Sequence, residues 1–288
     1  MFDFRYHALS LASVFIALVV GLLLGVAIGD KELVSSASNE IRDSLRRDVV
    51  RANGERNDAR TNLLREQEYA EKSYPILAGG RLRGRQIGLV MLGENDGVLE
   101  TVDRALEPTG ATLKVVAVVK SSVDTSELAD RARGTRYQAL ATDDGLLEDF
   151  GRRMGAQMVE GGRLISVART ALLRSLSGSF GDLDGVIVMR SDGGPKDKQA
   201  ADRLKELQGG IVRGLAAAGL SVAGIETRKT DPSQVGWYRD HELSSVDNID
   251  ETAGRAALVF VLAGSDGSFG RKDSAQGLLP PVVRSERP

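Results

Sequence analysis

The chain has 288 residues, no cysteine and a formal net charge of -2, and aromatic residues make up only 5% of it. The absence of cysteine excludes disulfides, zinc thiolate sites, iron–sulfur ligation and thiol catalysis. The nearly balanced charge argues against a nucleic-acid partner, and the scarcity of aromatic residues argues against a surface that stacks sugars or bases.

Residues 8–28 form an apolar stretch of 21 residues with no charge and only two serines. At about 1.5 Å per residue, a helix of this length crosses the roughly 30 Å hydrocarbon core of a bilayer. A buried helix of a soluble domain would need a polar stripe, which this stretch lacks. Ala27-Ile28-Gly29 fits a signal-peptide cleavage site, but the apolar run exceeds the usual length of about 7–15 residues. We therefore expect residues 1–29 to be an uncleaved single-pass anchor.

Small residues recur at every fourth position of this stretch: Ser13, Ala17, Gly21, Gly25 and Gly29. Residues four apart lie on one helix face, and small side chains let two membrane helices approach closely. The spacing predicts a homodimer that forms within the membrane. The alternative is chance, because glycine is common in membrane helices.

Residues 30–74 are rich in charges of both signs and predict a long helix. Apolar residues follow a spacing of three or four: Leu45, Val49, Ala52, Ala59, Leu63 and Ala70. This seam predicts a weak two-stranded coiled coil, with a single solvated spacer helix as the alternative. Pro75 and Gly79-Gly80 are expected to end the helix and mark a domain boundary.

Residues 81–288 alternate between apolar runs and helical segments, which predicts an α/β domain with a Rossmann-like, doubly wound parallel sheet. The apolar runs are continuous, as expected for strands buried on both faces. The expected strands are 86–92, 113–119, 185–189, 221–225 and 257–262, and the expected helices are 98–107, 143–158, 162–176 and 196–218.

Three glycine-rich loops are expected at the carboxyl ends of these strands, where open parallel sheets bind ligands. They carry Glu94, Asp96, Asp192 and Asp266. Convergence of these acids would create a site for a cation, a polar ligand or a protein partner. The alternative is ordinary turn chemistry, in which Gly and Asp supply left-handed conformations and helix caps. None of the loops matches a nucleotide-binding pattern.

Candidate metal ligands are few. Met154 and Met158 are four residues apart and could present two thioethers to Cu(I), although such a pair more commonly packs in a core. His241 lies beside Asp240 and Glu242 and could bind a metal or simply lie at the surface. No serine, lysine or carboxylate pair forms a catalytic motif, so we expect a protein that is not an enzyme.

Three motifs carry a family resemblance that extends over essentially the whole chain. They are residues 4–15 with the glycine spacing, residues 245–250 ahead of Gly254, and Phe269-Gly270 with the Leu-Leu-Pro-Pro run of 278–281. Together they resemble the actinobacterial family named after the mycobacterial copper transport protein B. We interpret residues 245–250 with Gly254 as a structural turn and helix cap, or as a partner surface.

The resemblance implies a non-enzymatic envelope protein at the cell membrane, linked to copper export or tolerance, with its α/β domain on the outer side. Copper is the only metal that it suggests. Some members of the family are instead implicated as partners of a cell-division protein that controls cell-wall hydrolysis. A dimeric scaffold is therefore the alternative function.

Overall fold

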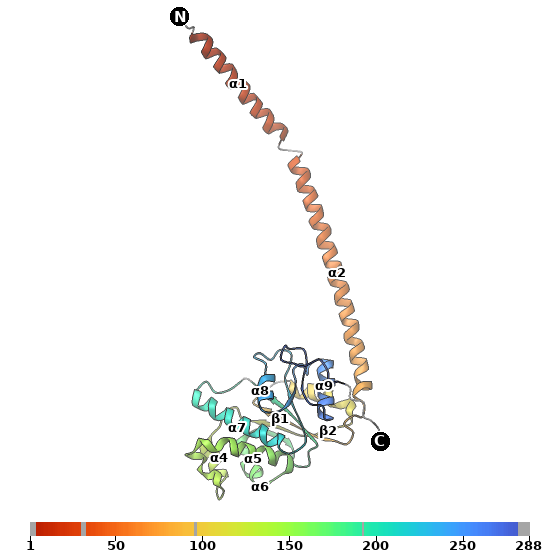
Figure 1. Ribbon diagram of the computed structural model, residues 1–288, viewed down its shortest axis with the longest axis vertical. Helices are drawn as coiled ribbons and strands as arrows, with labels where there is room; N and C mark the ends of the chain where they lie inside the picture. The colour runs from red at the N-terminus through yellow and green to blue at the C-terminus, as the bar shows by residue number, and fades with distance from the viewer. Residues whose placement is uncertain (1–3, 30–32, 95–96, 192, 282–288) are drawn as a thin grey trace. The chain divides into compact units, whose positions relative to one another are not determined.

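The computed structural model describes residues 4–29, 33–94, 97–191 and 193–281 (Figure 1). Asp96 and Asp192 lie outside these ranges. The chain divides into two compact units, residues 1–66 and 67–288. Each unit is described below by itself.

The first unit contains helix α1 (Phe4–Gly29) and most of helix α2 (Leu33–Ala78). Tyr6–Ala27 is long and apolar enough to cross a membrane, with a mean hydropathy of 2.7, and none of it is buried. The small-residue positions Ser13 and Ala17 are exposed, and a Cβ atom added at Gly21 or Gly25 would meet nothing within 4 Å. Gly29 is the last residue of α1.

Helix α2 continues through Pro75 and ends at Ala78, so the expectation that Pro75 ends the helix was wrong. The last turn is held by tertiary packing, because Tyr74 and Ala78 are both buried. The Tyr74 hydroxyl also donates a hydrogen bond to the carbonyl oxygen of Ala105. Such contacts offset the backbone hydrogen bond that a proline inside a helix removes. Gly80 follows with a positive φ of 68°.

The second unit is an α/β domain built on one seven-stranded sheet, in the order β3-β2-β1-β4-β5-β6-β7. The α/β class predicted from the sequence is confirmed. The strands are β1 (Gln86–Leu92), β2 (Thr112–Val119), β3 (Leu173–Gly178), β4 (Gly185–Arg190), β5 (Ser221–Ile225), β6 (Ser244–Val246) and β7 (Ser268–Phe269). All neighbouring strands are parallel except β3, which pairs antiparallel with β2. The sheet is therefore mixed and not wholly parallel.

Helices cover both faces of this sheet (Figure 1). They are α3 (Val98–Leu106), α4 (Thr125–Arg131), α5 (Leu147–Glu160), α6 (Arg163–Leu172), α7 (Lys198–Ala216), α8 (Val235–Asp240) and α9 (Thr252–Leu262), with short 3₁₀ turns at Glu107–Thr109, Arg136–Ala141 and Asp144–Leu146. Alternate residues of β1 enter two cores. Val90 and Leu92 pack in the core that includes α4–α7, whereas Ile87 and Leu89 pack in the core that includes α3 and α9.

Two predicted elements were wrong. Residues 257–262 lie in helix α9 and do not form a strand. A short apolar run cannot by itself distinguish a buried strand from a buried helix, and most of α9 is buried. The predicted helix 162–176 ends at Leu172, after which residues 173–178 form the edge strand β3. The short strands β6 and β7 were not predicted.

Candidate functional site

The sheet reverses its direction of winding between β1 and β4. The chain passes from β1 through α3 to β2 on one side, and from β4 through α7 to β5 on the other. The loops after β1 and β4 therefore diverge, and a crevice opens at the carboxyl ends of these neighbouring strands. This is the edge at which the sequence predicted a site.

A hollow of about 410 Å³ occupies this crevice, and we call it the switch-point hollow. Its described lining residues are small or polar: Glu94, Ser121, Ser122, Ser191, Gly193, Gly194 and Pro195. The absence of a side chain at Gly93 lets the loop after β1 approach the loop after β4. A Cβ atom at Gly93 would overlap the Ser191 hydroxyl, and the φ of Gly93, 105°, is one that favours glycine.

The chemistry of the switch-point hollow is hydrogen bonding. Three serine hydroxyls can each donate and accept, while the Glu94 carboxylate forms an ion pair with Arg174 of β3. The hollow can thus hold a polar group of a ligand or of a partner protein. Of the four acids predicted to converge here, the structure places Glu94 at this edge, and Asp96 and Asp192 lie outside the described residues.

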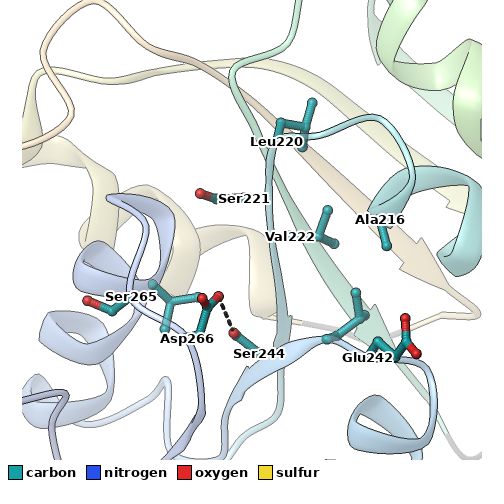
Figure 2. Close-up of a pocket in the computed structure, with 10 residues that line it drawn as sticks. Ala216, Leu220, Ser221, Val222, Glu242, Ser244, Ser265 and Asp266 are labelled. Carbon is teal, nitrogen blue, oxygen red and sulfur yellow. Dashed lines mark hydrogen bonds between the residues drawn. The ribbon is translucent and has the colours of Figure 1, made fainter.

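Asp266 lies at the opposite edge of the sheet, so its predicted convergence with Glu94 was wrong. It precedes β7, whose parallel pairing with β6 puts Asp266 at the amino end of these strands. The error follows from the mistaken strand 257–262, since a loop after a helix need not lie at the carboxyl edge. Figure 2 shows Asp266 near Ser244, whose hydroxyl lies 3.5 Å from the carboxylate, beside a hollow of about 120 Å³.

A buried polar network at the carboxyl edge was missed by sequence reasoning. Glu226, directly after β5, is fully buried. Its Oε1 accepts hydrogen bonds from Lys272 Nζ at 2.6 Å and from the Ser233 hydroxyl at 2.8 Å. Lys272 Nζ also donates to the carbonyl oxygen of Thr230 at 2.6 Å. The buried Glu226 carboxylate is therefore paired and hydrogen-bonded, as burial of an ion requires, while Lys272 remains partly exposed.

Arg190, the last residue of β4, extends this network toward the switch-point hollow. Its backbone amide donates to the Tyr238 hydroxyl at 2.9 Å, and its Nε donates to Gln208 Oε1 at 3.1 Å. The Tyr238 hydroxyl in turn donates to the carbonyl oxygen of Ile225 at 2.8 Å. The sequence signal for this network was a charged residue at the end of an apolar run, as at Arg190 and Glu226.

Asp247, directly after β6, explains two of the sequence motifs. Its carboxylate oxygens accept hydrogen bonds from the backbone amides of Arg271 and Lys272, at 2.8 and 2.9 Å. A Cβ atom at Gly270 would overlap this carboxylate, and one at Gly254 would overlap the carbonyl oxygen of Asn248. The motif 245–250 and the Phe269-Gly270 pair therefore fix one buried turn, as expected for a structural turn. The expected helix cap is not seen, because Glu251, the N-cap residue of α9, makes no side-chain capping hydrogen bond.

The structure shows where the candidate metal ligands lie. Met154 and Met158 of α5 are fully buried in the core that includes α4–α7. His241 follows α8, its ring centroid lies 4.1 Å from that of Trp237, and its Nδ1 lies 2.8 Å from the Trp237 carbonyl oxygen. Among the described residues, no group of three or more His, Cys, Asp or Glu side chains is placed to hold a metal ion.

Comparison with known proteins gives one consistent result. Residues 1–280 match the family described as "Copper transport outer membrane protein, MctB". The chain is also similar to the proteins named "Copper transporter MctB" of Mycobacterium bovis and Mycobacterium tuberculosis. Each is 24% identical over 301 aligned residues, which cover 91% of this chain and 92% of the relative.

Proposed function

Because this chain belongs to the family of the copper transport outer membrane protein MctB, we propose that it is an envelope protein that supports copper export or tolerance without catalysing a reaction. In this proposal α1 is an uncleaved, single-pass anchor in the cell membrane. The α/β domain lies on the outer side of that membrane.

The apolar surface of α1 carries the proposal. The span Tyr6–Ala27 is 22 residues long, and its large apolar side chains are exposed, including Leu22 at 69% and Phe15 at 60%. An apolar surface of this extent needs lipid or a partner helix to cover it. A bilayer satisfies this need along the whole length of the helix.

The α/β domain acts in this proposal by docking a partner and not by storing copper at the methionine pair. The thioethers of Met154 and Met158 are enclosed in the core, so Cu(I) could reach them only if the core opened. The switch-point hollow, in contrast, is open and lined by the hydroxyls of Ser121, Ser122 and Ser191. These groups can receive polar atoms of a partner protein that carries copper further.

Copper tolerance in cells tests the proposal. Cells that lack the chain should grow more poorly in copper, and the full chain should restore their growth. A variant in which residues 1–29 are replaced by a cleavable signal peptide should fail to restore it, although the domain still reaches the outer side. Full restoration by this unanchored variant, or unchanged growth of the deletion strain in copper, would refute the proposal.

A second candidate function is a dimeric scaffold that binds a cell-division partner regulating cell-wall hydrolysis. Exposed apolar side chains along α2 favour it, since Ile41, Leu45, Val49 and Leu63 are 57–61% exposed and could pair with a second copy. Cells lacking the chain would then show altered septation or wall hydrolysis in copper-free medium. The copper-handling proposal predicts normal division under that condition.

A further inference from the structure

The elements α4, α5 and α6 lie together on one side of the domain (Figure 1). Between them lies a cleft of about 450 Å³, which we call the arginine cleft. Arg131 reaches it from the end of α4, Arg133 from the following turn, Arg153 from α5 and Arg163 from the first turn of α6. Arg131 and Arg133 are close in the sequence, and the fold brings them together with Arg153 and Arg163 from two other helices.

The lining of the arginine cleft contains no carboxylate among the described residues. Within the same part of the chain, the only ion pair formed by a lining arginine joins Arg133 to Asp130, at 2.8 Å. Arg131, Arg153 and Arg163 are exposed, and none of them forms an ion pair in the part of the chain that the structure describes. The cleft therefore presents a strong positive potential within a concave surface, which focuses the field on an anion.

A neighbouring hollow provides an internal contrast. It shares Tyr137 and Arg153 with the arginine cleft and is also lined by Arg136 and Arg152. There, Asp149 pairs with both Arg136 and Arg152. The hydrogen bond from Arg152 is the main reason why the pKa of Asp149 lies below its ordinary value. Asp149 thus offsets part of the arginine charge in that hollow, whereas no carboxylate lines the arginine cleft.

The amino end of α6 adds to the positive potential. Arg163 and Leu164 are the first two residues of this ten-residue helix and both line the cleft. The first turn of α6 has no acidic residue. The Oε1 atom of Gln157 accepts a hydrogen bond from the Ile165 amide at 2.9 Å, which ties α5 to this helix end. A helix amino terminus attracts anions through its free amides and its dipole.

We propose that the arginine cleft binds a phosphate ester or pyrophosphate group. The planar guanidinium fork matches phosphate oxygens in pairs, so several converging arginines suit a multiply charged phosphoryl group. The cleft volume falls within the range of about 300–1,000 Å³ that is typical of ligand sites. Leu164 and Val167, the latter 42% exposed, offer an apolar wall for the organic part of the ligand.

Titration of the full chain in nanodiscs of zwitterionic lipid tests the proposal, with inorganic pyrophosphate as the probe. Calorimetry should show saturable binding at low salt that weakens as salt increases. The double variant Arg153→Gln/Arg163→Gln should bind at least tenfold more weakly. Arg169→Gln is the matched control, because Arg169 is exposed on the same helix but does not line the cleft, and its affinity should stay within twofold of the parent.

Competition against pyrophosphate identifies the source of the phosphoryl group. Stronger competition by a short-chain phosphatidic acid than by glycerol 3-phosphate would assign the cleft to a lipid phosphate, and equal competition would assign it to a soluble phosphate ester. Both outcomes support the proposal. Absence of saturable binding, equal affinity of the double variant and the parent, or equal weakening in Arg169→Gln would overturn it. Unchanged thermal unfolding of each variant confirms that the fold is retained.

Discussion

Gly155 of α5 lies directly against the carbonyl oxygen of Ile211 in α7, with no room for a Cβ atom between the two helices. The contact repeats along the helix pair in both directions, at Gly151 against Leu207, Gly210 against Glu148 and Gly214 against Arg152. Each helix thus places two glycines four residues apart at the crossing. This backbone contact holds α5, and with it Met154 and Met158, in the core.

Replacing Gly155 with alanine should therefore destabilise the domain, because the methyl group must push α5 away from α7. We expect a loss of about 2 kcal/mol or more in the free energy of unfolding. Gly236→Ala in α8 is the matched control, since a Cβ atom there meets nothing within 4 Å, and it should be neutral or slightly stabilising. Unfolding can be followed through Trp237, the only tryptophan. Equal stability of the two variants would contradict the backbone contact.

Acidification should weaken the attachment of the α2 end to α9. The Thr252 hydroxyl donates to Glu71 Oε1 at 2.6 Å, and Arg255 forms an ion pair with the same carboxylate. The Thr252 hydrogen bond is the main cause that lowers the pKa of Glu71, and Arg255 contributes. A carboxyl whose pKa is lower in the folded state stabilises the fold at neutral pH. This contribution disappears as the pH falls through the folded pKa.

The variant Glu71→Gln should therefore be less stable than the parent at pH 7, and the difference should shrink once the pH is below about 4. Denaturation midpoints at several pH values measure this. Glu68→Gln is the control, because its ion pair with Lys72 is exposed on both sides and should contribute little. A stability difference for Glu71→Gln that does not change with pH would show that the carboxylate charge is not involved.

Leucine at both methionine positions should leave copper tolerance unchanged. The variant Met154→Leu/Met158→Leu conserves volume in a fully buried region and should cost less than about 1.5 kcal/mol per site. Growth in copper and Cu(I) titration of the purified full chain provide the measurements. Loss of saturable Cu(I) binding in a variant that remains folded would instead establish the pair as a copper site.

Dimerisation should begin in α1 and continue into α2. The absence of native cysteine allows a single cysteine at Leu45, which is 58% exposed, to report on the distance between two copies. Cross-linking should be efficient in the parent and should collapse in Gly21→Ile/Gly25→Ile, because bulky side chains separate membrane helices. Unaltered cross-linking in the double variant would exclude the glycine face as the dimer contact.

Local patterns predicted most of the central sheet. The run 86–92 is β1 with the same bounds, and 221–225 is β5. These strands are buried on both faces, so their continuous apolar character carries the signal. The run 257–262 has the same character but forms part of the mostly buried helix α9, whose apolar side chains pack in the core that includes α3. Only the tertiary packing distinguishes the two cases.

The sequence predicted that Glu94 lies at the carboxyl edge of the sheet, but it did not predict the buried polar network or the arginine cleft. Glu94 follows a recognisable strand, so its place at the carboxyl edge could be predicted. The pairing of Lys272 with Glu226 joins residues 46 positions apart in the sequence, and the arginine cleft combines three helices. Such convergence depends on how the elements pack, which no local pattern encodes.

The mass of the intact chain extracted from membranes tests the central claim most directly, since the proposed role requires that α1 remains attached as an anchor. Mass spectrometry of the detergent-extracted protein should give the full-length mass of 30.8 kDa, with residues 1–29 still present. A mature chain that begins near Asp30 and is recovered outside the membrane would contradict the anchored envelope role.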